Sequence, residues 1–355
     1  MHVSSSPKSE LQVHDNTRLP RRTRPAKPVR KAKRHLKPAY KTAFGRMYCG
    51  LAEETLSQPP LTALAKSVQL IFTSPPFPLN TKKRYGNLNG SEYVDWLAAF
   101  GPRFRNLLAD NGSVVIEVGN AWEPGRPVMS TLALRALIAL QEKADLRLCQ
   151  EFICYNPARL PSPAQWVTVE RIRVKDAYTR LWWMSASDRP KADNRRILQP
   201  YSSAMRQLLK RKKYSSGQRP SQHNIGATSF LVDHGGSIPP NVLTISNTKS
   251  NDRYQQYCRE NGIVGHPARM PLDLASFFIK FLTEPGDLVL DPFAGSNTTG
   301  FAAETLKRRW MSIEASQDYV EASFPRFYLD DEPKHRTGVE RTHARSRTVP
   351  KIAGR

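Results

Sequence analysis

The sequence predicts an α/β fold with a doubly wound, mostly parallel β-sheet. Short apolar runs alternate with helical stretches over residues 44–184, and the alternation returns over residues 264–328. Two runs, at residues 68–72 and 287–290, are predominantly apolar, which is typical of strands buried on both faces. Both end abruptly in proline and polar residues. In an open α/β sheet, such strands deliver functional groups at their carboxyl ends.

Composition excludes several classes of protein. The chain has 355 residues, enough for one large α/β domain with a smaller insertion. It has no run of eighteen apolar residues and no apolar segment near its basic N-terminus, so neither a transmembrane helix nor a secretory signal is expected. The four cysteines lack zinc-site spacing and are expected to be reduced thiols in a cytosolic protein: Cys49, Cys149, Cys154 and Cys258.

The net charge indicates the kind of partner. A formal charge of +23 favours a polyanion. Residues 1–40 carry eleven lysines and arginines against two acids, and residues 333–355 carry seven against one. Residues 1–43 and 329–355 are therefore expected to be basic tails, the first of them disordered, that bind nucleic acid without reading its sequence. Disordered arms that only increase solubility fit the same composition.

The folded body is expected to begin near Phe44 and to reach its first buried strand at residues 68–72. The segment at 80–90 that follows is basic and contains glycine, as in a mobile loop that closes over a nucleic acid. Its three consecutive basic residues are expected to bind phosphates: Lys82, Lys83 and Arg84. A plain solvated loop is the alternative.

The elements after this loop continue the alternation of strands and helices. Ser91 can cap one helix from Glu92 to Leu108, and Pro127 can open the next. The further elements expected are a strand at 113–118, a helix at 127–142, and strands at 146–155 and 179–184. In the last strand Trp182 and Trp183 point to opposite faces, so one is expected in the core, whereas the other can shape a binding pocket.

The strand end at Asp291 is a candidate cofactor site. Asp291 places a carboxylate there, and Pro292 blocks further ladder pairing. Gly295 and Gly300 allow the backbone to turn tightly and to approach a ligand closely. The residue types thus favour a small cofactor held at the carboxyl end of this strand.

A helix and a second acid follow the turn. Thr298 or Thr299 can cap a helix at 300–306, and the next strand, at 310–313, ends in Glu314. An acid about twenty residues after a glycine turn is well placed to accept hydrogen bonds from ribose hydroxyls. A dinucleotide site is the main competitor, but the glycine spacing is not G-x-G-x-x-G. A turn that merely joins strand to helix would not explain two acids at two strand ends.

The strand end at Ser74-Pro75-Pro76-Phe77 is a candidate reactive site. The two prolines fix an extended backbone and leave two residues without N–H donors. The segment can therefore offer carbonyl acceptors, the Ser74 hydroxyl and the Phe77 ring. Acceptors beside an aromatic face suit a planar group that carries an NH₂, and an amino-bearing nucleobase is one such group.

Four blocks of this sequence, in the right order, resemble those of the β-class DNA amino-methyltransferases, and most of all the modification methyltransferases of the PvuII type. Residues 73–77 resemble the S-P-P-F/Y motif of enzymes that modify the exocyclic nitrogen of cytosine, and residues 291–299 look like their S-adenosylmethionine motif. Residues 175–183 resemble their strand-and-aromatic block, and residues 265–271 their helix-opening motif. The matching segments span about residues 46–325.

The resemblance implies a circularly permuted S-adenosylmethionine-dependent methyltransferase fold with an insertion. Residues 44–184 would be its catalytic half, 185–263 a target-recognition region and 264–328 its cofactor-binding half. The alternation fails in the middle segment, which is rich in Arg, Lys, Ser, Asn, Gly and Gln. Its basic residues include candidate phosphate binders: Arg211, Lys212 and Lys213. Part of it could instead be a long surface excursion, and its histidines lack the partners of a metal site.

The resemblance also assigns roles within the site. The expected catalytic residues hold and stack on a flipped cytosine: Ser74, Pro75, Pro76 and Phe77. The residues expected to bind S-adenosyl-L-methionine are Asp291, Pro292, Phe293, Gly295, Ser296, Thr298, Glu314 and Pro267. Transfer would be direct and in line, without a covalent intermediate, which agrees with the absence of a Pro-Cys nucleophile motif. No metal is implied.

The implied partner is double-stranded DNA, and a cognate restriction endonuclease acting on the same site is a candidate second partner. The implied location is the cytoplasm of a prokaryote, at the nucleoid through DNA, with no membrane partner. The sequence leaves open whether the protein is a monomer or a dimer. The competing activities are methylation of adenine N6, methylation of RNA, and DNA binding with a dead cofactor site. Serine before Pro-Pro favours cytosine, by family usage.

Overall fold

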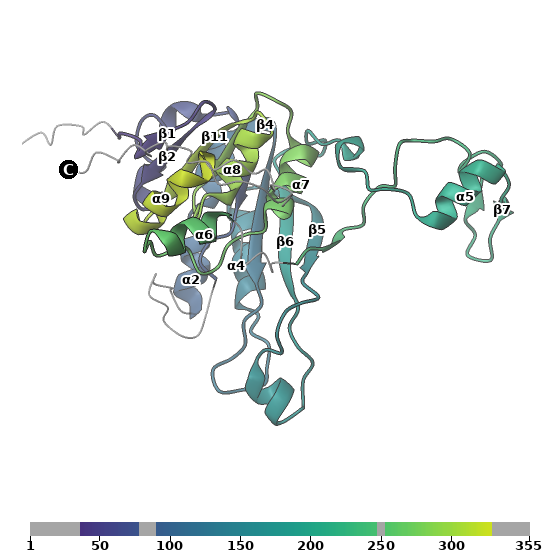
Figure 1. The fold of residues 1–355 in the computed structure, drawn as a ribbon, viewed down its shortest axis with the longest axis horizontal. Helices are drawn as coiled ribbons and strands as arrows, with labels where there is room; N and C mark the ends of the chain where they lie inside the picture. The colour runs from purple at the N-terminus through teal and green to yellow at the C-terminus, as the bar shows by residue number, and fades with distance from the viewer. Residues whose placement is uncertain (1–35, 78–89, 247–252, 329–355) are drawn as a thin grey trace, which may run out of the picture. The chain divides into compact units, whose positions relative to one another are not determined.

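The computed structural model describes residues 36–77, 90–246 and 253–328, and one nine-stranded sheet lies at its centre (Figure 1). Its strands are β1 Tyr40–Lys41, β2 Gly45–Cys49, β3 Val68–Thr73, β4 Leu108–Gly119, β5 Arg147–Tyr155, β6 Tyr178–Ser185, β9 Val242–Thr244, β10 Leu288–Asp291 and β11 Arg309–Glu314. Their order is β1-β2-β11-β10-β3-β4-β6-β5-β9. Among these described strands only β1 and β6 run against the rest, so the predicted mostly parallel sheet is confirmed.

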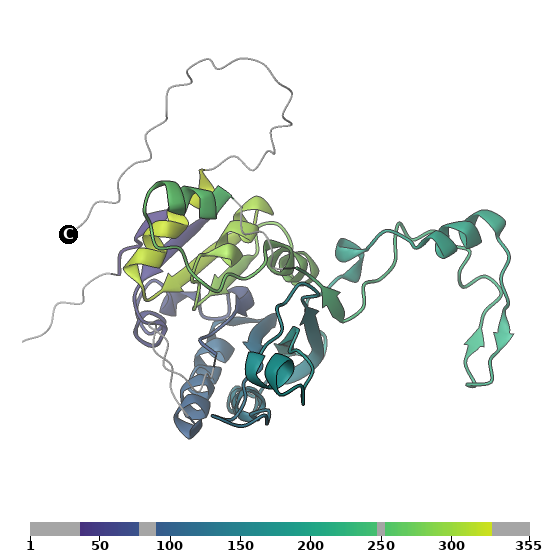
Figure 2. The ribbon, with the colours of Figure 1, turned by 60° about the horizontal axis from the view of Figure 1, so that its bottom comes forward.

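Helices cover both faces of this sheet. The α-helices of the described residues are α1 Ala52–Thr55, α2 Gly90–Ala98, α3 Gly101–Leu107, α4 Leu132–Lys143, α5 Ser203–Arg211, α6 Arg253–Glu260, α7 Leu272–Leu282, α8 Thr298–Thr305 and α9 Gln317–Ser323. Helices α2, α3 and α4 pack on one face, and α7, α8 and α9 pack on the other. Figure 2 shows the blue helices and the yellow-green helices on different sides of the sheet. The fold is therefore doubly wound, as predicted.

Strand β3 shows why its sequence is predominantly apolar. All six of its residues are buried. Leu70 and Phe72 pack against the side of α7, whereas Ile71 faces the side of α2 and α4. Both faces of the strand are thus covered, and full burial of the Phe72 side chain alone contributes roughly 2–3 kcal/mol. This packing on both faces holds the strand end in place.

Two predicted helices differ from the structure. The helix expected at 92–108 is two helices, because Pro102 stands in the first turn of α3, where its missing N–H costs nothing but where it stops α2 from continuing. The first of the two, α2, begins at Gly90, one residue before the expected cap, Ser91. The helix expected from Pro127 begins at Leu132, because the preceding residues form a turn closed by a bridge between Trp122 and Met129.

The N-terminal boundary also needs correction. Strand β1 lies within residues 1–43, which the charge pattern assigned to a disordered tail. The Tyr40 ring packs against Trp310 and Phe324, and its hydroxyl lies 2.7 Å from the Ser323 hydroxyl. One buried aromatic therefore anchors a segment whose composition is otherwise polar. The remainder of that tail, the tail at 329–355 and the predicted phosphate binders of the loop at 80–90 lie outside the described residues.

The ends of the predicted insertion, residues 185–263, contact the main body. Strand β9 extends the sheet beside β5, and α6 packs through Tyr254 and Cys258 against Ala322 of α9. Earlier in the segment, before β9, lie α5 and a small ribbon, β7 Gly217–Gln218 and β8 Asn224–Ile225. No residue of α5 is buried, so this helix is not part of the core. The division into functional regions stays a prediction. None of the described helices is long and apolar enough to span a membrane.

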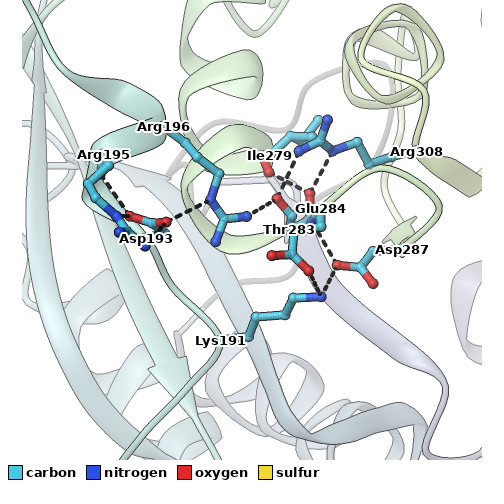
Figure 3. A network of polar contacts seen from close by, with 9 residues as sticks. All are labelled: Lys191, Asp193, Arg195, Arg196, Ile279, Thr283, Glu284, Asp287 and Arg308. Carbon is cyan, nitrogen blue, oxygen red and sulfur yellow. Dashed lines mark hydrogen bonds and ion pairs between the residues drawn. The ribbon is translucent and has the colours of Figure 1, made fainter. Parts of the chain in front are cut away.

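A polar network fixes the start of this segment to the end of α7 (Figure 3). Lys191 Nζ lies 2.7 Å from Asp287 and 2.8 Å from Glu284. The Thr283 carbonyl accepts from Arg196 at 2.5 Å and from the buried Arg308 at 2.8 Å. Because Asp287 directly precedes β10, the network lies at the amino ends of the parallel strands, away from the strand ends that carry the candidate site.

Replacing Arg308 with methionine should lower the free energy of unfolding by about 2–3 kcal/mol, because Arg308 donates to both the carbonyl and the hydroxyl of Thr283 and a charged donor is lost. The urea midpoint of unfolding measures this change. Arg309→Met is the matched control, since the exposed Arg309 makes one hydrogen bond, to the Gly286 carbonyl. Equal losses in the two variants would contradict the assigned role of the network.

Candidate active site

The ends of β3 and β10 lie side by side, although 218 residues separate Thr73 from Asp291 in the sequence. Leu70 pairs with Val289 and Ile71 with Leu290 in a parallel ladder. Beyond the paired residues the Thr73 hydroxyl donates to Asp291 Oδ1 at 2.6 Å. The reactive and cofactor stretches predicted from the sequence therefore meet at one edge of the sheet.

A cavity of about 1020 Å³ opens at this edge. The predicted residues that line it are Ser74, Pro75, Pro76, Phe77, Asp291, Pro292, Phe293, Gly295, Ser296, Thr298 and Glu314. Pro267 lies between two lining residues, His266 and Ala268, and is not itself a lining residue. The residues that sequence reasoning missed include Glu53, Tyr93, Trp96, Glu117, Arg159, Thr179, Arg269 and Tyr319.

A buried carboxylate, Glu117, stands behind Ser74. It accepts a hydrogen bond from the Thr179 hydroxyl at 2.7 Å and another from the Ser74 hydroxyl. Burial raises the pKa of Glu117, although both hydroxyls and the positive charge of Arg159 oppose the shift. The signal in the sequence is a single acid inside the apolar run Val114 to Val118. Because Ser74 uses its proton on Glu117, its oxygen is free to accept a hydrogen from a ligand.

The Phe77 ring lies against the backbone of Gly119, at the end of β4. A Cβ atom added at Gly119 would stand 2.6 Å from the Phe77 ring, closer than real Cβ contacts come. Glycine is therefore required there so that the ring can lie against the strand end. The half-buried ring is left as one wall of the cavity.

Gly119→Ala should displace the Phe77 ring. It should lower the rate of the methyl transfer expected from the sequence at least ~10-fold, because the reaction slows when a group that positions the substrate is displaced. Gly125→Ala is the control for loss of a glycine on the same connection, since a Cβ there meets nothing within 4 Å. Its positive φ makes it the more strained substitution, so stability loss alone would affect Gly125→Ala at least as much. Steady-state rates and melting temperatures of both variants decide between displacement of the ring and general destabilisation.

Two carboxylates, the buried Asp291 and the half-buried Glu314, define the cofactor side of the cavity. Asp291 accepts from the Thr73 and Thr299 hydroxyls and, at 3.1 Å, from the Phe293 N–H. Burial nevertheless raises its pKa from 3.8 to about 6. Glu314 accepts from the Gly295 N–H at 2.8 Å and from the Ser316 N–H at 2.9 Å, and burial raises its pKa as well.

In the part of the chain that the structure describes, these two carboxylates have no positive partner. Among the ion pairs of the described residues, none involves Asp291 or Glu314. Buried carboxylates that are hydrogen-bonded but not neutralised favour a ligand that brings its own positive charge. The site thus fits a cationic ligand that also carries hydroxyl groups.

The turn between Asp291 and α8 is shaped by Asn297 rather than by a threonine cap. Asn297 adopts a left-handed conformation with φ of 54°, and its side chain accepts from the Gly300 N–H at 3.2 Å and the Ser312 hydroxyl at 2.7 Å. Its amide also donates to the Tyr40 hydroxyl at 2.9 Å. The predicted cap, Thr298 or Thr299, was wrong, because α8 already begins at Thr298 and Asn297 caps it by accepting from the Gly300 N–H. Gly295, with φ of 51°, makes the other sharp bend.

An aromatic wall closes one side of the cavity. The rings of Trp96 and Phe293 lie 5.5 Å apart between centroids, and the Trp96 indole donates to Glu53 Oε1 at 2.5 Å. Trp96 was expected in the core of its helix, but it is half-buried and lines the cavity. The two tryptophans of β6 differ from this: Trp182 and Trp183 are buried in the two opposite core clusters, and neither lines the cavity.

The predicted phosphate binders that the structure describes lie away from the cavity. Arg211 ends α5, Lys212 caps it in a left-handed conformation with φ of 53°, and Lys213 follows. All three are exposed, and none lines the cavity. Their role as DNA contacts stays a prediction.

The fold is that of a doubly wound α/β protein in which the two candidate strand ends share one cavity. The family model described as a DNA methylase matches residues 68–325. The chain therefore belongs to the DNA methylase family, and the resemblance found in its four sequence blocks is confirmed.

The chain is also similar to individual members of this family. The Type II methyltransferase M.PvuII of Proteus hauseri is 46% identical over 293 residues, which cover 82% of this chain and 86% of the relative. M.HindIII of Haemophilus influenzae is 24% identical over 71% of this chain and 75% of its own. The solved structure of the PvuII DNA methyltransferase, described as cytosine-N4-specific, aligns with a TM-score of 0.66 and 40% identity over 83% of this chain and 90% of that chain.

Proposed function

We propose that the protein transfers a methyl group from S-adenosyl-L-methionine to the exocyclic N4 amino group of a cytosine in double-stranded DNA. One observation carries the proposal: a single cavity holds both the Ser74–Phe77 strand end and the two unneutralised carboxylates, Asp291 and Glu314. The similarity to a relative described as cytosine-N4-specific supports cytosine as the base. Double-stranded DNA agrees with the net charge of +23.

The residues around Asp291 fit this cofactor. The positively charged methionine part of the cofactor would lie beside Asp291, and its ribose hydroxyls would donate to Glu314; the bend at Gly295 lets the backbone approach the cofactor closely. The wall of Trp96 and Phe293 offers apolar surface for an adenine ring. When bound, S-adenosyl-L-methionine supplies an electrophilic methyl group on a sulfonium centre.

The residues around Ser74 position the acceptor. A cytosine amino group is paired inside the duplex, so the base must leave the stack, at a cost of a few kcal/mol. Phe77 stacks on the extruded ring, while the Pro75 carbonyl and the Ser74 oxygen accept the two amino hydrogens. These acceptors hold the hydrogens away from the path of attack, so the nitrogen lone pair faces the methyl group. Positioning of this kind accounts for most of the expected acceleration.

Glu117 gives the released proton a destination. As the nitrogen gains its methyl group, one of its hydrogens becomes acidic. Ser74 takes that proton on its oxygen and passes its own hydroxyl proton to Glu117, to which it is already hydrogen-bonded. The raised pKa of Glu117 makes it a better proton acceptor than an exposed carboxylate.

We assign DNA binding to basic residues of two segments. Arg211, Lys212 and Lys213 of the segment at 185–263 and the Lys82–Arg84 group bind phosphates, and the segment reads the target sequence. This methylation would protect the DNA against a cognate restriction endonuclease that recognises the same site. DNA binding and protection against an endonuclease both place the protein on DNA in the cytoplasm of a prokaryote.

Methyl transfer can be tested with S-adenosyl-L-methionine that carries a labelled methyl group. Genomic duplex DNA and total RNA are offered together at equal mass as competing substrates. The label should enter the DNA. Label in RNA alone would show an RNA methyltransferase. Absence of cofactor binding by calorimetry would show a DNA-binding protein with a dead site.

A further inference from the structure

The connection between β5 and β6, residues 156–177, leaves the sheet at the edge that carries the cavity (bottom of Figure 1). We refer to it as the β5–β6 excursion. Asn156 and Arg159 at its root line the cavity together with Thr179 of β6. These residues share the reactive side of the cavity with Glu117, whose pKa the positive charge of Arg159 lowers in part. The excursion therefore begins beside the place proposed for the extruded base.

The excursion has a defined internal structure. The Lys175 ammonium donates to the carbonyls of Pro157 and Arg159, each at 3.1 Å, and the Asp176 N–H donates to the Ser162 carbonyl at 3.0 Å. Trp166 is buried, and its carbonyl accepts from the N–H groups of Ile172 and Arg173. These bonds join the outgoing and returning parts, so the excursion can present side chains in fixed positions.

Two side chains on it are unusually exposed for their type. Val174 is 85% exposed and Leu160 is 80% exposed, the highest fractions among the large apolar side chains of the described residues. Leu160 follows Arg159, and Val174 precedes Lys175. The Lys175 ammonium bonds the carbonyl of the peptide between Arg159 and Leu160, so the two segments that carry these side chains lie together. Apolar surface of this kind, beside a cavity, indicates a contact.

Charge indicates the chemistry of that contact. The excursion carries four basic residues and two acids. Arg173 pairs with Asp176, and Glu170 accepts from Gln165. The exposed Arg159 and Arg171 form none of the ion pairs found among the described residues. Exposed apolar side chains and arginines on one segment match the faces of nucleobases and the phosphates that flank them.

We infer that Leu160 and Val174 form an apolar wedge that contacts the base pairs left unstacked when the target cytosine enters the cavity. This inference rests on the proposed function. Extrusion exposes the faces of the neighbouring bases to water, and an apolar side chain that covers those faces offsets part of the cost of unstacking. Arg159, one residue before Leu160, is placed to bind a phosphate next to the extruded nucleotide. The wedge thus acts on extrusion and not on the cofactor.

The test compares two duplexes that carry the site found modified in DNA from an expressing cell. In one duplex the target cytosine is paired with guanine, and in the other it faces a mismatch, which makes extrusion easier. Leu160→Ala combined with Val174→Ala should lower kcat/KM at least ~10-fold on the paired duplex and about 2-fold or less on the mismatched one. Binding of S-adenosyl-L-methionine by calorimetry should not change.

Two variants serve as controls. Leu160→Met combined with Val174→Ile keeps the apolar volume and should retain wild-type rates on both duplexes. Ile138→Ala removes an exposed apolar side chain from α4, outside the cavity lining, and should also retain them. Sedimentation of the double alanine variant checks whether the patch instead joins two copies of the chain.

The outcomes separate the wedge from the proposed function. Wild-type protein that transfers no methyl group to either duplex would overturn both. With an active wild type, three results would overturn the wedge alone: unchanged rates in the double alanine variant, an equal loss on both duplexes, or a changed oligomeric state with unchanged transfer. A loss confined to the paired duplex supports it.

Discussion

Asp291→Asn should lower the affinity for S-adenosyl-L-methionine at least ~100-fold and, at neutral pH, raise the stability of the cofactor-free protein. The affinity falls because a buried charge that faces a cationic ligand is removed, and such pairs contribute several kcal/mol. Asparagine keeps an oxygen that can accept from the Thr73 hydroxyl and the Phe293 N–H. The loss is therefore electrostatic and does not come from collapse of the turn.

The stability gain follows from the direction of the pKa shift. Burial raises the pKa of Asp291 from 3.8 to about 6, so the folded state binds this proton more tightly than the unfolded chain. Ionisation of Asp291 therefore costs stability as the pH rises from about 4 to 6, by roughly 1–3 kcal/mol once complete. Asparagine avoids this cost, so its gain should be full near pH 8 and should shrink toward pH 4.

Calorimetric titration with the cofactor and melting curves at pH 5 and pH 8 measure these two effects. Asp145→Asn is the control, because Asp145 is exposed and adopts a left-handed φ of 48° that asparagine tolerates. It should change neither property. Wild-type affinity in Asp291→Asn, or a gain in melting temperature that does not depend on pH, would contradict the role given to this carboxylate.

Glu117→Gln should lower the rate of methyl transfer in a single turnover by about 10²–10³-fold while cofactor affinity stays unchanged. Glutamine has nearly the same shape and keeps one oxygen that can accept from Thr179, but it cannot take the proton that Ser74 passes on. Ser74→Ala should produce a similar loss by removing the relay and one acceptor. The two losses should not add, because both residues serve one proton path.

The pH profile distinguishes proton acceptance from positioning. Burial raises the pKa of Glu117, so the wild-type rate should fall as the pH drops through that raised value and Glu117 becomes protonated. Glu117→Gln should lack this acidic limb. Glu142→Gln, on the exposed surface of α4, should keep both the rate and the limb. A Glu117→Gln profile with an unchanged acidic limb would show that Glu117 is not the group that titrates.

Much of the site was predictable because its residues stand where strands stop. Ser74, Asp291 and Glu314 each follow an apolar run, and parallel strands deliver their ends to one edge of the sheet. The sequence does not say which strands are neighbours, so the contact between Thr73 and Asp291 became visible only in the ladder of β3 and β10.

Other residues were missed for physical reasons. Glu117 lies within an apolar strand, where one acid is indistinguishable from an outward-facing charge until the antiparallel neighbour β6 supplies Thr179. Trp96 is at a helical position that suits the core, but it borders the cavity because Phe293 arrives from a distant turn. Tyr40 and Asn297, 257 residues apart, bond to each other, and nothing local in either segment signals that contact.

The identity of the methylated nucleoside tests the proposed site most directly. Duplex DNA methylated by the purified protein with labelled S-adenosyl-L-methionine is digested, and the labelled nucleoside is identified by mass spectrometry. N4-methyldeoxycytidine is the expected product, because Ser74, Pro75 and Phe77 are proposed to present an exocyclic amino group to the cofactor side of the cavity and the similarity to a cytosine-N4-specific relative favours cytosine. Label in N6-methyldeoxyadenosine would contradict the choice of base, and label on a ring carbon of cytosine would contradict the proposed arrangement.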